Sequence, residues 1–132
     1  MTFLLDTDIC IAALRGVPGV VDAMLKHSPE ELAVSSITRY ELGTGVAKSA
    51  ESRRQTELQK VETFLSMVHE LIFDTKAANV SAEIRADLER KGTPIGPMDL
   101  LIAATALVNN LTLVTANIKE FSRIESLKLE TW

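Results

Sequence analysis

Short apolar runs and longer segments with helical periodicity alternate along this chain of 132 residues. The apolar runs predict strands at residues 2–5, 31–36, 70–74, 111–115 and 127–130. Strands that alternate with helices, with few hairpin signals, are typical of a parallel α/β sheet. We therefore expect a central parallel sheet whose ligand site lies beyond the carboxyl ends of the strands.

The segments between these strands predict helices, and several of them carry end signals. The predicted helices span residues 8–15, 18–27, 39–47, 55–67, 76–91 and 98–110. Thr7 is the expected N-cap of the first helix, Gly16 ends it, and Gly92 ends the fifth. A polar stretch at 48–57 and a rigid loop at 92–97 connect neighbouring elements. The last predicted helix is apolar almost all round, so we expect it to be buried.

Composition places further limits on the class of protein. Apolar residues make up 46% of the chain, enough for a sizeable core, and the length predicts one domain over residues 1–132. The single cysteine, Cys10, excludes an intrachain disulfide and fits the reducing cytoplasm. The net charge of −4 argues against nucleic-acid binding through overall charge, although it allows a local basic patch. No apolar run approaches the roughly 20 residues that span a bilayer, so we expect no membrane association.

Acidic and amide side chains follow the predicted strands at the points where the strands end. Asp6 comes directly after the first strand, and Glu41 lies just inside the helix after the second. Asp99 opens the buried helix, while Asn117 and Glu120 follow the fourth strand. If the sheet is parallel, these side chains converge at one edge of it.

Converging carboxylates require a counter-charge, because they cannot all remain ionised without one. A hard divalent cation supplies it, and Mg²⁺ prefers oxygen ligands of this kind. Bound at this edge, the ion would orient a phosphodiester, activate a water molecule and neutralise charge on the attacked phosphate. The two histidines, His27 and His69, are not at metal-ligand spacing, which argues against zinc.

Glu41 also has a purely structural explanation. Thr38-x-x-Glu41 matches a capping box, and Ile37 with Leu42 would form its hydrophobic staple. Such a cap does not exclude metal binding, but it would explain the glutamate without it.

The other polar residues have local explanations as well. The helix macrodipole favours Asp99 and Asp8 in the first turns of their helices. Asn117 fits a turn after a strand, and Glu120 fits a solvated helix surface. Asp6 is the hardest to explain structurally, because it follows an apolar strand directly.

Four segments together resemble the ordered motifs of a known family. These are "LLDTDICIA", "SSITRYELGTG", "IRADLERKGTPIGPMDLLIAATAL" and "LVTANIKEF". They are similar to the motifs of PIN-domain proteins and, more narrowly, of the VapC-type toxins of bacterial toxin–antitoxin pairs. The resemblance implies a three-layer α/β/α fold with a central parallel sheet, and an endoribonuclease that depends on Mg²⁺ or Mn²⁺.

The resemblance also assigns the site. The family's metal-binding positions fall here on Asp6, Glu41, Asp99 and, at the fourth position, Asn117. Glu120 is a nearby acid that completes the set, and Thr115 is expected to orient a ligand or a water molecule.

Two positions depart from the family pattern, because Asp8 replaces the usual Asn and Ala116 stands where Arg is frequent. The neutral Asn117 puts a second metal ion in more doubt than the first.

The resemblance further implies partners. The expected substrate is RNA, in particular a tRNA anticodon stem-loop, cut to leave 5′-phosphate and 3′-hydroxyl ends. A VapB-type antitoxin would occupy a hydrophobic groove formed by helices 8–15 and 18–27, and would direct a basic side chain toward the metal site. A homodimer and a toxin–antitoxin hetero-oligomer are also implied.

Basic side chains beside the acidic motifs would offset the repulsion between this site and a phosphate backbone. The candidates are Arg39, Lys48, Arg53, Arg54, Arg85, Arg90, Lys91, Lys119 and Arg123. Aromatic residues make up only 5% of the chain, so backbone and shape contacts are expected to dominate over base stacking.

Two other functions remain open from the sequence. "LLDTDIC" also resembles the D-x-D motif of haloacid-dehalogenase-like phosphatases, in which Asp6 would be the nucleophile. Alternatively, acids at strand ends occur in non-catalytic signalling modules that bind Mg²⁺, and Asp74 would then be the phosphate acceptor.

Overall fold

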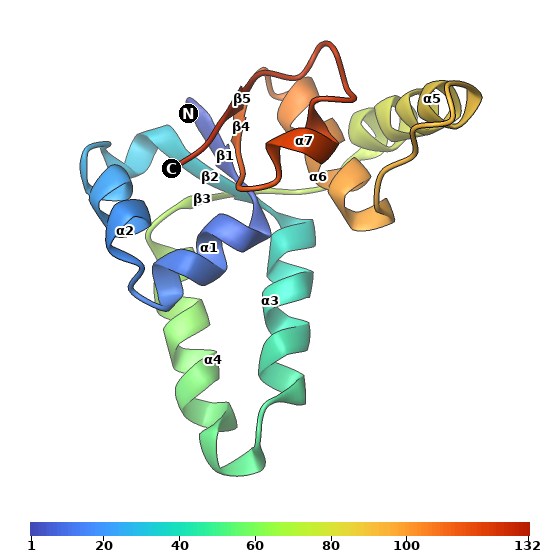
Figure 1. The fold of residues 1–132 in the computed structure, drawn as a ribbon. Helices are drawn as coiled ribbons and strands as arrows, with labels where there is room; N and C mark the ends of the chain where they lie inside the picture. The colour runs from blue at the N-terminus through green and yellow to red at the C-terminus, as the bar shows by residue number, and fades with distance from the viewer.

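The computed structural model describes all 132 residues, and a five-stranded sheet lies at its centre (Figure 1). The strands are β1 (Phe3–Leu5), β2 (Leu32–Ser35), β3 (His69–Leu71), β4 (Thr112–Val114) and β5 (Leu129–Glu130). They lie side by side in the order β3-β2-β1-β4-β5, and every neighbouring pair is parallel. The predicted parallel α/β sheet is therefore confirmed.

Seven α-helices connect or follow these strands. They are α1 (Thr7–Leu14), α2 (Pro18–Leu25), α3 (Ser36–Lys48), α4 (Glu51–Ser66), α5 (Thr75–Arg90), α6 (Pro97–Val108) and α7 (Ile118–Phe121), and a 3₁₀ turn (Pro29–Glu31) precedes β2. Helix α4 begins inside the stretch that we expected to be a polar connection, because its first turns are fully exposed and give no apolar periodicity. None of the helices has the length and apolar content that crossing a bilayer requires.

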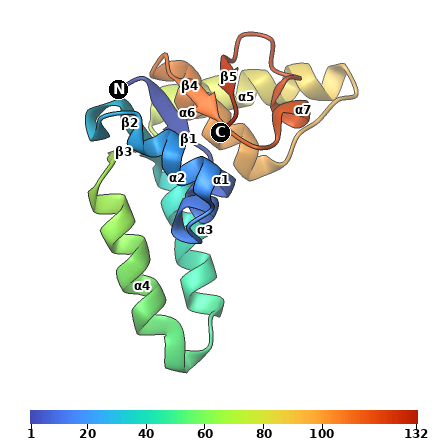
Figure 2. The same cartoon turned by 60° about the vertical axis from the view of Figure 1, so that its left-hand side comes forward.

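The two faces of the sheet bury two separate apolar cores, which gives the three layers of an α/β/α fold. Phe3 and Leu5 point to one face and Leu4 to the other, as the strand period of two requires. The first core also contains side chains of α1, α2, α3 and α4, and the second contains side chains of α5, α6 and α7. Figure 2 shows from a second direction that α1 to α4 and α5 to α7 lie on different sides of the strands. Cys10 lies in the first core, as its apolar neighbours predict.

The central strand β1 lies between β2 and β4, so the chain connections diverge to opposite sides of it. Ligand sites of open α/β sheets lie at such switch points, beyond the carboxyl ends of the strands. The backbone here leads directly into the site: α1 starts two residues after β1 ends, and α3 follows β2 without a loop. The Asp6 N–H donates to the carbonyl of Val114 at 2.9 Å, which places the ends of β1 and β4 side by side.

Candidate active site

Asp6 lies at the centre of the candidate site and is only 4% exposed. It is the N-cap of α1, which corrects the prediction of Thr7, because its carboxylate accepts a hydrogen bond from the Thr7 N–H at 2.8 Å. The Thr115 hydroxyl donates to the other carboxylate oxygen at 2.7 Å. The buried charge that was hardest to explain from the sequence is therefore held between the first turn of α1 and the end of β4.

The structure contradicts the capping box proposed for Glu41. Helix α3 begins one turn earlier than predicted, with Ser35 as its N-cap, and the Ser35 hydroxyl accepts from the Thr38 N–H at 3.1 Å. Ile37 and Leu42 pack into different cores, so they form no staple. The Glu41 carboxylate instead accepts a hydrogen bond from the Thr7 hydroxyl at 2.6 Å, which directs it toward the end of β1.

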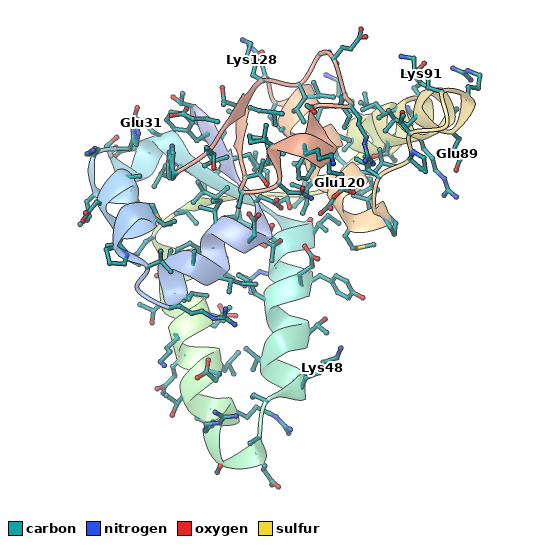
Figure 3. The ribbon with its side chains drawn as sticks, in the orientation of Figure 1. Glu31, Lys48, Glu89, Lys91, Glu120 and Lys128 are labelled. Carbon is teal, nitrogen blue, oxygen red and sulfur yellow. The ribbon has the colours of Figure 1, made fainter.

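Asp99 and Glu120 face each other at the start of α6. A Cβ atom placed on Gly96 would lie 3.5 Å from Asp99 Oδ2 and 3.7 Å from Glu120 Oε1, so both carboxylates border the same small space. Glu120 accepts from the Gly96 N–H at 2.7 Å and from the side-chain amide of Asn117. Figure 3 shows Glu120 between α7 and the beginning of α6. The alternative explanation of Glu120 as a solvated helix charge does not account for these two hydrogen bonds.

Asp8 also belongs to this cluster, although its position in the first turn of α1 had a local explanation. Its Oδ2 accepts from the Ala116 N–H at 3.1 Å, and the Thr115 hydroxyl lies 3.4 Å from the same oxygen. Its other oxygen, Oδ1, is buried and has no hydrogen-bond partner. An unpartnered buried carboxylate oxygen is costly and marks a position where a cation or a donor is expected.

The acids of the cluster also influence one another electrostatically. Burial, followed by the charge of Asp8, raises the pKa of Asp6 from 3.8 to about 7. Burial, followed by the charge of Glu120, raises the pKa of Asp99 to about 6, and Glu41 and Asp8 contribute in the same direction. The pKa of Glu120 is lowered, chiefly by the hydrogen bond from Gly96.

The donor set fits a hard divalent cation, because it consists of carboxylate and amide oxygens and includes the orphaned oxygen of Asp8. No three acidic or histidine side chains converge here into a ready-made metal-binding group. Oxygens of Asp6, Glu41 and Glu120 accept hydrogen bonds from hydroxyl and amide donors instead. These acids are linked by the effect of their charges on one another's pKa values, and not by a closed metal-coordination shell.

Several of the expected RNA-contacting cations are engaged elsewhere. Arg39 forms ion pairs with Glu62 at 2.9 Å and Glu70 at 2.8 Å, which join α3 to α4 and β3. Arg85 pairs with Glu89, and both Arg90 and Lys91 pair with Asp87 on α5. Figure 3 shows Lys91 at the far end of α5 from Glu120, and Lys48 at the far end of α3.

Three hydroxyl groups around Glu41 were not predicted from the sequence to be part of the site, although Thr7 and Thr38 were expected to be helix caps. The hydroxyls of Thr7, Ser35 and Thr38 are buried around Glu41 and bond to one another. The only signal for them in the sequence is that each lies at or just after the end of a strand, where serine and threonine also occur as ordinary helix caps.

A parallel sheet with a buried aspartate and further acids at its switch point is what a PIN domain is expected to have, and the model of the PIN domain matches residues 3–127. The chain belongs to the PIN-domain family and, within it, to the VapC ribonucleases. It is 39% identical over 132 residues to the tRNA(fMet)-specific endonuclease VapC of Salmonella typhimurium, covering 100% of this chain and 98% of that relative. Nucleases of this family depend on divalent metal ions.

Solved structures agree with this assignment. The DNA-bound VapBC of Salmonella typhimurium matches with a TM-score of 0.93 at 39% identity, covering 100% of this chain and 98% of that chain. VapBC2 of Rickettsia felis, bound to a DNA fragment from its promoter, matches with a TM-score of 0.90 at 40% identity, covering 100% and 99%.

The family assignment argues against the two alternative functions that the sequence left open, a phosphatase and a signalling module. A haloacid-dehalogenase-like phosphatase and a receiver-like module belong to different families from the one that this chain matches over nearly its whole length. Asp74, the acceptor in the signalling hypothesis, caps α5 by accepting from the Ala77 N–H at 2.9 Å.

Proposed function

We propose that this chain is the endoribonuclease toxin of a toxin–antitoxin pair and that Mg²⁺ is its metal ion. The observation that supports this most directly is Asp6, a carboxylate buried at the end of the central strand among four other acids, in a chain of the VapC family. Mn²⁺ would satisfy the same oxygen ligands.

The residues divide into two groups by role. Asp6, Glu41, Asp99 and Asn117 would hold the metal ion. An ion bound there would supply activation of a water molecule and neutralisation of charge at the attacked phosphate. Thr115 keeps Asp6 oriented through its hydroxyl, and Glu120 holds Asn117 beside the loop that carries Gly96. Asp8 adds negative charge to the cluster.

The substrate that we propose is the anticodon stem-loop of an initiator tRNA. The support is the name of the Salmonella typhimurium relative, a tRNA(fMet)-specific endonuclease, together with the small share of aromatic residues. Recognition would then depend on loop shape and backbone contacts rather than on base stacking.

Purified protein with Mg²⁺ should cut initiator tRNA once in the anticodon loop and leave 5′-phosphate and 3′-hydroxyl ends. We expect the rate on elongator methionine tRNA to be lower by about tenfold or more, which corresponds to about 1.4 kcal/mol of discrimination. Sequencing of the cleaved ends gives the position and the end chemistry. Equal cleavage of both tRNAs would contradict the substrate, and the absence of any cleavage would contradict the ribonuclease activity.

We further propose that a VapB-type antitoxin segment lies in a groove of about 640 Å³ between α1, α3 and α4. Ile11, Leu42 and Val61 contribute its apolar wall, and Glu41 lies at the end nearest the acidic cluster. A basic side chain of the antitoxin at that end would meet the acids. Helix α2 contributes no residue to this groove, in contrast to the expectation from the sequence. A homodimer of toxin subunits remains part of the proposed assembly.

Filling the groove should weaken antitoxin binding without unfolding the toxin. Gly45 lines the groove, and a Cβ atom there meets no other atom within 4 Å, so Gly45→Phe should place a ring in the groove. We expect the affinity for the cognate antitoxin to fall about tenfold or more. Gly43→Phe is the matched control, because Gly43 lies on the same helix in equally open space but outside the groove. Calorimetric titration measures both, and equal affinities for the two variants would exclude this groove.

A further inference from the structure

A chain of three buried hydroxyl groups ends on Glu41. Ser35 and Thr38 are fully buried and Thr7 is 9% exposed. The oxygens of Ser35 and Thr38 lie 3.4 Å apart, those of Thr38 and Thr7 lie 3.0 Å apart, and Thr7 Oγ1 lies 2.6 Å from Glu41 Oε1. The chain thus links the ends of β1 and β2 to one carboxylate of the site.

The direction of the protons in this chain follows from the acceptor at its end. An ionised carboxylate only accepts hydrogen bonds, so the single hydroxyl proton of Thr7 is given to Glu41. Thr7 must then accept from Thr38, because a hydroxyl has only one proton to donate. Thr38 accepts from Ser35 by the same argument. Every hydroxyl therefore donates toward Glu41, and aligned donors of this kind polarise and strengthen one another.

The arrangement fixes one oxygen of Glu41 and leaves the other free. The 2.6 Å contact lies in the range of short charge-assisted O–H···O⁻ hydrogen bonds. The second oxygen, Oε2, accepts no hydrogen bond from any other residue of the protein. A long glutamate side chain on a partly exposed helix turn otherwise samples several rotamers.

We propose that Thr7, Thr38 and Ser35 are positioning residues, which hold Glu41 in one rotamer and leave its second oxygen available to the metal ion that the site would hold. The inference rests on the proposed function, because it takes Glu41 as a ligand of that ion. Hydrogen-bond partners that orient ligands of this kind typically change affinity or activity by 10–100-fold when removed.

Valine substitutions test this chain, because valine keeps the shape of threonine and removes the hydroxyl. We expect Thr7→Val and Thr38→Val each to lower kcat for RNA cleavage by roughly 10–100-fold, with KM changed less than about twofold. Thr38→Ser, which restores the hydroxyl, should recover most of kcat. Thr105→Val is the matched control, since Thr105 is equally buried on α6 and its hydroxyl donates only to the Leu101 carbonyl. Thr105→Val should keep the wild-type kcat even if its melting temperature falls as much as that of Thr7→Val or Thr38→Val.

A measurement that needs no activity separates this inference from the proposed function. The side-chain carboxyl ¹³C resonance of Glu41 should shift in Thr7→Val and Thr38→Val and stay unchanged in Thr105→Val. An unchanged Glu41 resonance and wild-type kcat in both variants would overturn the positioning role, as would an equal loss of kcat in Thr105→Val. If the wild-type protein cleaves no RNA but the resonance shifts as expected, the chain of hydroxyls stands and the proposed function falls. Thr7→Val provides the test alone if Thr38→Val does not fold.

Discussion

Asp6→Asn should reduce RNA cleavage by about 10³-fold or more, or about 4 kcal/mol in activation free energy, and yet raise the melting temperature of the metal-free protein at pH 8. Asparagine keeps the acceptor that caps α1, so the local structure survives. It removes a carboxylate whose pKa is raised to about 7 by burial and by Asp8, and whose ionised form is therefore unfavourable in the folded state. Loss of activity with a gain of stability is the pattern expected of a functional charge.

Asp22→Asn is the matched control for this experiment, because Asp22 is an exposed acid on α2 that takes part in no ion pair. It should leave both the cleavage rate and the melting temperature at pH 8 unchanged. Cleavage assays and differential scanning calorimetry on the three proteins provide the comparison. A wild-type cleavage rate in Asp6→Asn would exclude Asp6 from the site. A lower melting temperature would show that the ionised carboxylate of Asp6 does not destabilise the folded protein.

The melting temperature of the metal-free protein should fall as the pH rises from about 4 to about 7, and then level off. The pKa values of Asp6 and Asp99 are raised from 3.8 to about 7 and about 6, so in this window the folded protein binds protons that the unfolded chain has released. Folding is therefore favoured by acid across the window and loses this contribution as both groups ionise. For Asp6 alone the loss is at most about 4 kcal/mol, from about 1.4 kcal/mol for each pH unit between the two values.

Mg²⁺ should reverse this loss at pH 8 and have little effect at pH 5, because protons compete with the metal ion for the same oxygens. At a Mg²⁺ concentration 100 times the dissociation constant, the gain is about 2.7 kcal/mol. For a chain of this size this corresponds to roughly 10 °C in melting temperature. Calorimetry at both pH values measures it. Two results would contradict an acidic cluster whose ionisation destabilises the folded protein. One is a melting temperature that rises between pH 5 and 7 without metal, and the other is an equal Mg²⁺ effect at both pH values.

The parts of the site that the sequence predicted are those that depend on the end of a strand. Asp6 follows an apolar run that has to be a buried strand, and in a parallel sheet its neighbours at that edge are the residues that follow β2 and β4. The approach of Asp6 to Thr115 and of Asp99 to Glu120 follows from that topology once the order of the strands is known.

The parts that escaped prediction depend on where a helix starts and on contacts between distant residues. Both Ser35 and Thr38 are good N-caps, and the pattern alone favoured the later one because Glu41 completes a capping box with it. Because α3 follows β2 without a loop, Ser35 is the N-cap. Glu41 then takes no part in capping, and its carboxylate accepts a hydrogen bond from the Thr7 hydroxyl. No local pattern encodes a contact between Thr7 and Thr38, since it exists only when β1 and β2 are paired. The same is true of the groove, which needs the packing of α3 against α4.

A titration with Mn²⁺, followed by electron paramagnetic resonance, tests most directly whether residues from separate strand ends serve one metal ion. It compares the wild-type protein with Glu41→Gln, Asp99→Asn and the Asp22→Asn control. Glu41→Gln and Asp99→Asn should each weaken the binding of the same ion by about tenfold or more, although one residue lies on α3 and the other on α6. Binding that either variant leaves as tight as in the control would contradict a single shared site.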